Sequence, residues 1–125
     1  MDDAKSALDQ VITAFNARDY ETYESLMTDD VEAFAGVHTP LRFVGKADWM
    51  AFVRSLGRFS SVQQELRHAS YRAYGRDVVL SNAYFVFTTT ASDGTVAVQS
   101  GRQSVALVAI AGQWRVANFH FSALF

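Results

Sequence analysis

Apolar positions along the first half of the chain recur every three to four residues, the spacing of one helix face. They predict an amphipathic helix over residues 3–17 and a shorter helix over residues 20–28. Asp19, immediately before the second helix, provides its start signal. A third helix is predicted between Gly45 and Gly57. The apolar stripe of this third helix consists of Trp49, Phe52, Val53 and Leu56.

After Gly57 the apolar period changes from helical spacing to strict alternation, which is typical of strands. Asp-Gly and other short glycine turns separate the alternating segments and favour hairpins between them. Two short strands, Val31–Ala35 and Leu41–Val44, precede the third helix on either side of a turn at residues 36–40. The long strands are predicted at residues 62–74, 78–91, 95–110 and 113–123.

Helices followed by a long antiparallel meander indicate an α+β fold in a single domain over residues 1–125. Strands of about a dozen residues exceed the usual five or six, so the sheet must twist and curl. We expect a cone-shaped fold in which three N-terminal helices pack on a strongly curved, mostly antiparallel sheet. A cone of this kind has a hollow end where a ligand can bind.

Composition narrows the class of protein. The chain has no cysteine, which removes disulfides and thiolate ligands, and its net charge is −2, without the basic excess typical of nucleic-acid binding. The sequence contains no run of about 18 apolar residues, so no membrane span is predicted. The acidic N-terminus lacks the apolar core of a signal peptide, so we expect a cytoplasmic protein with no membrane or nucleic-acid partner.

The order of the predicted elements resembles the nuclear transport factor 2-like superfamily, which includes ketosteroid isomerases and SnoaL-like polyketide cyclases. Local segments are similar to the association (hub) domain of calcium/calmodulin-dependent protein kinase II and its stand-alone bacterial relatives. The resemblance implies the cone fold, also called a cystatin-like roll, and carries over no kinase role. The matching segments are residues 16–23, Thr28 to Phe34, Val44-Gly45, Gln99-Ser100 and Trp114 to Ser122.

The chain departs from the hub domain in the pocket that the resemblance implies. Hub domains hold carboxylate ligands there with one histidine and three arginines, and the aligned positions here are Trp49, Val86, Ser104 and Phe121. We therefore expect an apolar pocket that does not bind small anions strongly, with Arg102 as a remaining polar anchor. The complete predicted ligand-binding set is Trp49, Tyr84, Val86, Arg102, Ser104, Phe119 and Phe121.

Acid–base chemistry, the usual activity of enzymes with this fold, has only a few candidate residues. Asp30 and His38 follow the second predicted helix and are candidate bases, while Arg102 or Tyr84 could polarise a substrate oxygen. Where the isomerases place a tyrosine on the first helix, Phe15 is the nearest inward aromatic residue here. The histidines are not paired at metal-ligand spacing, so we predict no metal site and no cofactor.

The C-terminal strand carries Asn118 and His120 between phenylalanines, which indicates a pocket or a subunit interface. We take Trp114, Asn118 and His120 as interface candidates. Alternation also predicts an uncovered apolar outer face, and so a homodimer, since monomers rarely expose a large apolar patch. The residues assigned to that outer face are Phe85, Phe87, Val105, Leu107, Trp114 and Val116.

Two hypotheses of function follow from this sequence. The first is a homo-oligomeric module whose apolar pocket binds a small hydrophobic molecule. The second is a SnoaL-like or ketosteroid-isomerase-like enzyme, an isomerase, cyclase or dehydratase that acts on a cyclic substrate. The missing acid–base set favours the first hypothesis and leaves enzymatic activity open.

Overall fold

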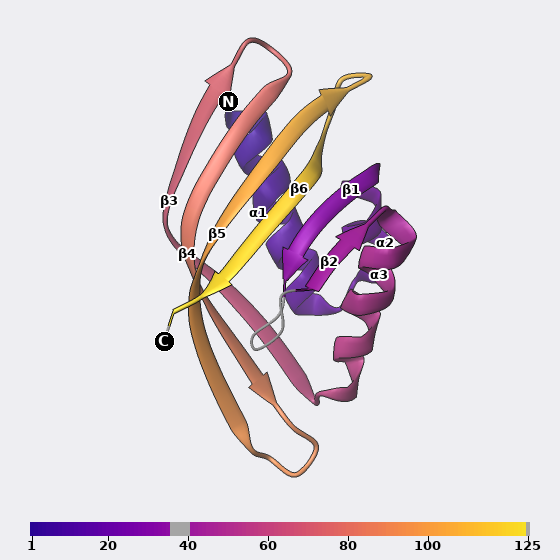
Figure 1. Ribbon diagram of the computed structural model, residues 1–125, viewed down its shortest axis with the longest axis vertical. Coiled ribbons are helices and arrows are strands. Elements are labelled where there is room, and N and C mark those ends of the chain that lie inside the picture. Colours follow the sequence, from indigo (N-terminus) through magenta and orange to yellow (C-terminus); the bar gives the residue numbers. More distant parts are fainter. Residues whose placement is uncertain (36–40, 125) are drawn as a thin grey trace.

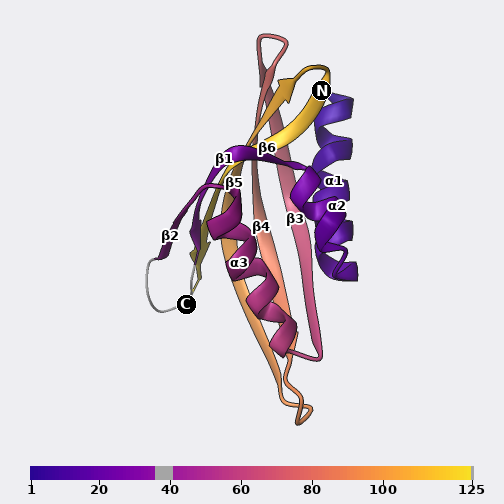
Figure 2. The same cartoon turned by 90° about the vertical axis from the view of Figure 1, so that its right-hand side faces the viewer.

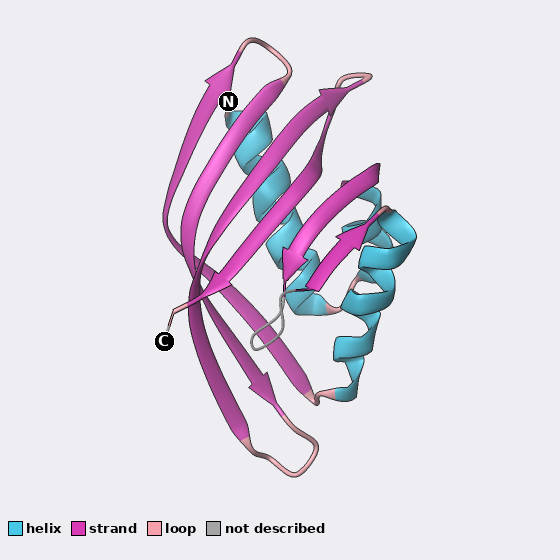
Figure 3. Ribbon diagram, viewed as in Figure 1, coloured by secondary structure: helices cyan, strands magenta, loops and turns pink. Residues whose placement is uncertain are grey.

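A computed structural model describes residues 1–35 and 41–124 of the chain. Its helical part is one long helix, α1 (Asp2–Ala17), two shorter helices, α2 (Tyr20–Ser25) and α3 (Lys46–Ser55), and a 3-10 turn, η1 (Leu56–Arg58). The strands are β1 (Met27–Ala35), β2 (Leu41–Val44), β3 (Ser61–Tyr74), β4 (Val78–Thr90), β5 (Val96–Ile110) and β6 (Gln113–Ala123). Figure 3 shows this division between helices and strands.

The strands form one sheet in the order β2-β1-β6-β5-β4-β3. The β3–β6 meander is antiparallel throughout, and only β1 runs parallel to its neighbour β6. Register shifts interrupt the β3–β4 ladder between Arg67 and Ser70 and the β5–β6 ladder between Ala106 and Leu107. Bulges of this kind increase local twist, and Figure 1 shows the long strands bending along their length.

The helices all lie on one side of the sheet. Figure 2, turned by 90° from Figure 1, shows α1 and α2 against that side, with α3 beside the β1–β2 hairpin. Apolar side chains from α1, α3 and the inner face of the sheet form the core, and Leu8, Val53 and Leu107 are among its fully buried members. The opposite face of the sheet carries none of the helices that the structure describes.

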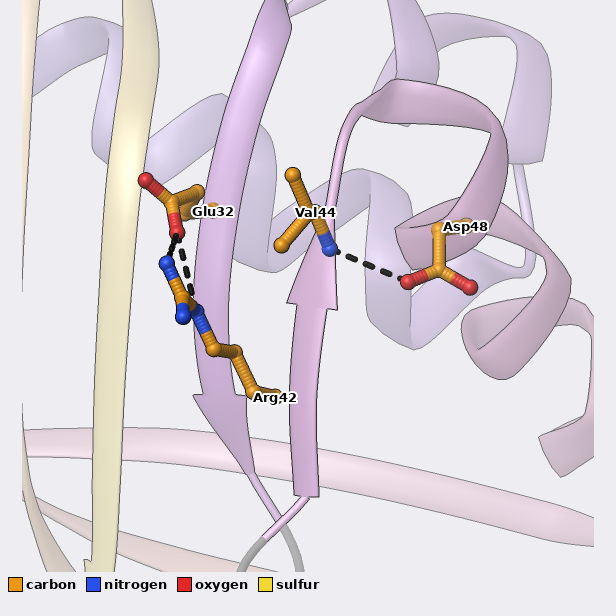
Figure 4. A network of polar contacts seen from close by, with 4 residues as sticks. All are labelled: Glu32, Arg42, Val44 and Asp48. Atoms are coloured by element: carbon orange, nitrogen blue, oxygen red, sulfur yellow. Dashed lines mark hydrogen bonds and ion pairs between the residues drawn. The ribbon is translucent and has the colours of Figure 1, made fainter.

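The β1–β2 hairpin leads directly into α3 and so sets the position of that helix. Arg42 on β2 forms an ion pair with Glu32 on β1 at 2.7 Å, and the Val44 amide donates to the Asp48 carboxylate at 3.0 Å (Figure 4). Both partners of the ion pair are largely exposed, so the pair contributes little to stability, below about 1 kcal/mol. The Val44–Asp48 hydrogen bond, rather than the ion pair, ties the start of α3 to the sheet.

The α+β architecture and the antiparallel meander are confirmed, but the end of the second helix and the start of the first strand were predicted wrongly. The second helix ends at Ser25 rather than at residue 28, and β1 begins at Met27. The cause is a long-range contact, since the Val116 amide of β6 donates to the Leu26 carbonyl and Met27 pairs with Val116. The third helix also follows β2, so the helices are not one N-terminal group.

The predicted faces of the long strands are also wrong. Phe85 and Phe87 of β4, Val105 and Leu107 of β5 and Val116 of β6 lie on the inner face, where they are buried or packed against the core. Trp114 is likewise packed against that core. The error arises because both alternating sets on these strands contain apolar residues, so alternation alone does not identify the inner set.

No described helix is long and apolar enough to cross a bilayer.

Candidate ligand-binding cavity

A cavity of about 900 Å³ lies between the helices and the inner face of the curved sheet. Eight of its 21 described lining residues are aromatic. The helices contribute Phe15, Tyr23, Trp49 and Phe52, and Phe59 follows η1. The sheet contributes Phe85, Phe87 and Phe121. A wall of this size and composition fits a small apolar molecule.

Trp49 is the centre of the aromatic wall. Its ring stacks on Phe121 with centroids 6.2 Å apart, and it packs against Phe119 and Phe52 at 5.4 Å each. Phe85 meets Phe121 edge-on at 5.8 Å. Trp49 is only 3% exposed because its indole is enclosed by these rings and by α2. Mutual packing therefore holds the wall in one arrangement.

One hydroxyl group lies within this aromatic wall. The Trp49 indole Nε1–H donates to the Tyr23 phenol oxygen at 3.1 Å, and both residues are buried. Burial raises the pKa of the Tyr23 phenol, and the hydrogen bond from Trp49 opposes this by a smaller amount. The phenol therefore stays protonated at neutral pH, and its own O–H has no acceptor among the described residues.

Polar groups lie at other points of the cavity. The Gln64 amide donates to the Gln103 side-chain oxygen at 2.7 Å, and Asn16 accepts from the Gln64 backbone amide. Arg58 is exposed, and its guanidinium stacks on the Phe59 ring at 4.6 Å. Among the described lining residues Arg58 is the sole charged side chain, and none is Asp, Glu or His.

Three of the predicted ligand-binding residues lie at this cavity. Trp49 and Phe121 line it, and Phe119 is buried directly behind them, stacked on Phe121 at 5.4 Å. Their predicted binding of a ligand remains a prediction.

The other four predicted binding residues point away from the cavity. Tyr84 and Val86 on β4, and Arg102 and Ser104 on β5, lie on the outer face. Val86 is part-buried and the other three are exposed. On β4 and β5 the positions aligned with the hub-domain arginines, Val86 and Ser104, face outward, and the residues one position away face inward. The inner neighbours are Phe85, Phe87 and Gln103, so Arg102 is not an anchor within the cavity.

The candidate bases do not converge on the described part of the cavity. Asp30 is exposed on β1 and is absent from the described lining. His38 lies outside the described residues. No three of the described His, Asp and Glu side chains lie close enough to hold one metal ion.

The interface candidates divide between the two faces. Asn118 and His120 lie on the outer face, where His120 pairs with Ser104 and its ring lies 5.5 Å from that of Phe34. Beside them the Ser104 hydroxyl donates to the Asn82 amide oxygen. Trp114 packs against the core instead.

The sequence analysis missed most of the cavity wall. Phe85 and Phe87 were assigned to the wrong face, and Tyr23 was not among the predicted site residues. Helical spacing was the usable signal, since it placed Phe15 on the buried face of α1 and predicted the apolar stripe of the third helix, whose members all line the cavity. No local pattern connects Tyr23 with Trp49, because the two meet only through the packing of α2 on α3.

Comparison with known proteins identifies the family to which this arrangement belongs. The model of the SnoaL-like domain matches residues 4–125. The chain belongs to the SnoaL-like family. This membership confirms the resemblance to the nuclear transport factor 2-like superfamily. A search of curated proteins gave no match.

Solved structures share the fold of this SnoaL-like domain at low sequence identity. A protein provisionally assigned as a scytalone dehydratase from Novosphingobium aromaticivorans has a TM-score of 0.88 at 10% identity, covering 100% of this chain and 84% of its own. A ketosteroid isomerase-like protein from Erwinia carotovora atroseptica has a TM-score of 0.81 at 20% identity, with coverages of 98% and 95%.

The resemblance to kinase association domains also has a structural counterpart. A protein from Xanthomonas campestris, provisionally assigned as a calcium/calmodulin-dependent protein kinase II association domain, has a TM-score of 0.82 at 14% identity. The match covers 94% of this chain and 82% of that one. At these identities the three likenesses establish the fold alone.

Proposed function

We propose that this SnoaL-like domain is a homo-oligomeric module that binds a small, largely apolar cyclic molecule in its cavity. The single observation that carries the proposal is the cavity of about 900 Å³ walled by aromatic rings. Aromatic walls favour flat or ring-shaped ligands because faces and edges of rings pack well against one another. Trp49, Phe119 and Phe121 have the central positions in this binding role.

The chemistry of the wall supports binding over acid–base catalysis. A general acid or base must come within hydrogen-bond reach of the reacting atoms. The described lining offers neither a carboxylate nor an imidazole, and Asp30 lies away from it. The dehydratase and isomerase assignments of structural neighbours belong to those proteins, and catalysis on a cyclic substrate is the less favoured alternative.

The outer face of the sheet supports self-association. Phe34, Val44 and Tyr84 are large apolar residues there that are 45%, 58% and 49% exposed. Asn82, Ser104 and His120 lie among them and offer hydrogen-bonding groups. A face that combines exposed apolar residues with hydrogen-bonding groups suits a second copy of the same surface, related by twofold symmetry.

Binding can be tested with N-phenyl-1-naphthylamine, a neutral aromatic probe whose emission rises in apolar sites. We expect saturable binding of one probe per chain with a Kd of roughly 100 µM or tighter, the range that ligand efficiency allows for a molecule of this size. Emission equal to that of a folded protein without a cavity would contradict the proposal.

A pair of neighbouring substitutions locates the binding site. Thr89 lines the cavity, whereas Thr88 lies on the outer face of the same strand. Thr89→Trp should fill part of the cavity and weaken probe binding about tenfold, while Thr88→Trp should leave it unchanged. Equal effects of the two substitutions would place the probe elsewhere.

A further inference from the structure

Tyr23 is the buried polar side chain of the cavity whose hydrogen-bonding capacity is only half used. A phenol oxygen accepts hydrogen bonds and donates one. The acceptor side is engaged by Trp49 Nε1–H at 3.1 Å. Among the described residues no acceptor lies within reach of the phenol proton, although the residue is only 3% exposed.

The Trp49–Tyr23 contact orients the phenol. Because indole N–H is a donor only, the Tyr23 proton cannot point toward Trp49 and must take another direction about the C–O bond. The Phe15 ring, which also lines the cavity, packs against Tyr23 with ring centroids 5.9 Å apart. A buried donor left unpaired is destabilising, so an acceptor brought by a ligand would recover that energy.

We propose that Tyr23 recognises a carbonyl oxygen on the cyclic ligand, with Trp49 holding the phenol in the donating orientation. This inference rests on the proposed function and adds the chemical class of ligand, a cyclic ketone or aldehyde with an otherwise apolar skeleton.

A neutral oxygen fits this position better than an anion. The rings around Tyr23 offer no second donor and no countercharge, and burying an unpaired anion among them would be costly. Burial also raises the pKa of the phenol, so the proton remains on Tyr23 throughout the physiological pH range. Arg58, the charged residue of the described lining, is exposed and stacks on Phe59.

Two probes that differ by one oxygen test the inference. 1-Indanone and indane share the same fused-ring skeleton, and each can be titrated against bound N-phenyl-1-naphthylamine. Tyr23→Phe should weaken 1-indanone binding about fivefold to tenfold, the equivalent of one net hydrogen bond, and should leave indane binding unchanged. Tyr20→Phe is the matched control, since Tyr20 is also on α2 but does not line the cavity.

Infrared spectroscopy provides a second test that needs no variant and so does not depend on the folding of Tyr23→Phe. The carbonyl stretch of 1-indanone bound to the unaltered protein should lie at a lower frequency than in cyclohexane, as a hydrogen bond requires. An unshifted stretch, or equal loss of both probes in Tyr23→Phe, would overturn the inference. If N-phenyl-1-naphthylamine itself does not bind, the proposed function fails together with the inference.

Discussion

Gly101 on β5 lies where the inner wall of the cavity leaves no space for a side chain. A Cβ atom built at this position would collide with ring carbons of Phe85 and with the backbone oxygen of Ser122. Gly101 pairs with Phe85 across the β4–β5 ladder, so the phenylalanine ring lies over the glycine. The Phe85 ring can therefore occupy its place in the cavity wall only because residue 101 has no side chain.

We predict that Gly101→Ala lowers the free energy of unfolding by about 1–3 kcal/mol, the usual cost of overpacking. It should also weaken probe binding, because the Phe85 ring must move. Urea unfolding and probe titration measure the two effects. Gly57→Ala is the control, since its added Cβ would meet only the Tyr20 hydroxyl at an ordinary 3.6 Å. If the two variants were equally stable, β4 and β5 would accommodate the added methyl group at little cost in free energy, which would contradict the prediction.

At the scale of elements, the β5–β6 hairpin carries local backbone strain. Its two central residues, Ala111 and Gly112, have φ of 52° and 77°, as a type I′ turn requires. Alanine is disfavoured in this left-handed region, whereas Asn-Gly is the preferred pair in such turns. The hairpin forms because the long strands on either side pair over their length, despite the residue at its tip.

Ala111→Asn should therefore raise the free energy of unfolding by about 0.5–1 kcal/mol, since it relieves part of the left-handed penalty. The same exchange at Ala51, exposed on α3, should lower it by about 0.5 kcal/mol through lost helix propensity. Thermal and urea unfolding of the two variants give the comparison. A loss of stability at Ala111 would show that the turn differs from type I′.

At the scale of the whole molecule, we predict a dimer formed through the outer face of the sheet. Sedimentation equilibrium at micromolar concentration should give twice the chain mass of 13.9 kDa. An ordinary interface would bury about 800 Å² of each subunit. Tyr84→Arg should convert the dimer to a monomer because it removes an exposed aromatic ring and adds a positive charge to each subunit beside the cross-strand neighbours Arg67 and Arg102. Ile110→Arg is the control, at a residue equally exposed at 49% but beside the β5–β6 turn. A monomeric parent protein would contradict this prediction.

Sequence patterns alone were sufficient to predict the class of fold and most of the elements. Helical spacing identified α1 and α3, and alternation with glycine turns identified β3 to β6 to within a residue or so at each end. These are local signals, because each depends on the preferences of neighbouring residues and on the residues that turns require. The resemblance to the nuclear transport factor 2-like superfamily followed from the order of these elements, and the resemblance to hub domains followed from similar local segments.

The buried face of the sheet and the position of the cavity depend on tertiary packing and could not be predicted from local patterns. On β4 the alternating sets Tyr84 with Val86 and Phe85 with Phe87 are both apolar, so a strand turned by one residue fits the pattern equally well. The packing of α1 and α3 selected the phenylalanines for the inside. The Tyr23–Trp49 hydrogen bond joins residues on separate helices, and no local pattern specifies such a contact.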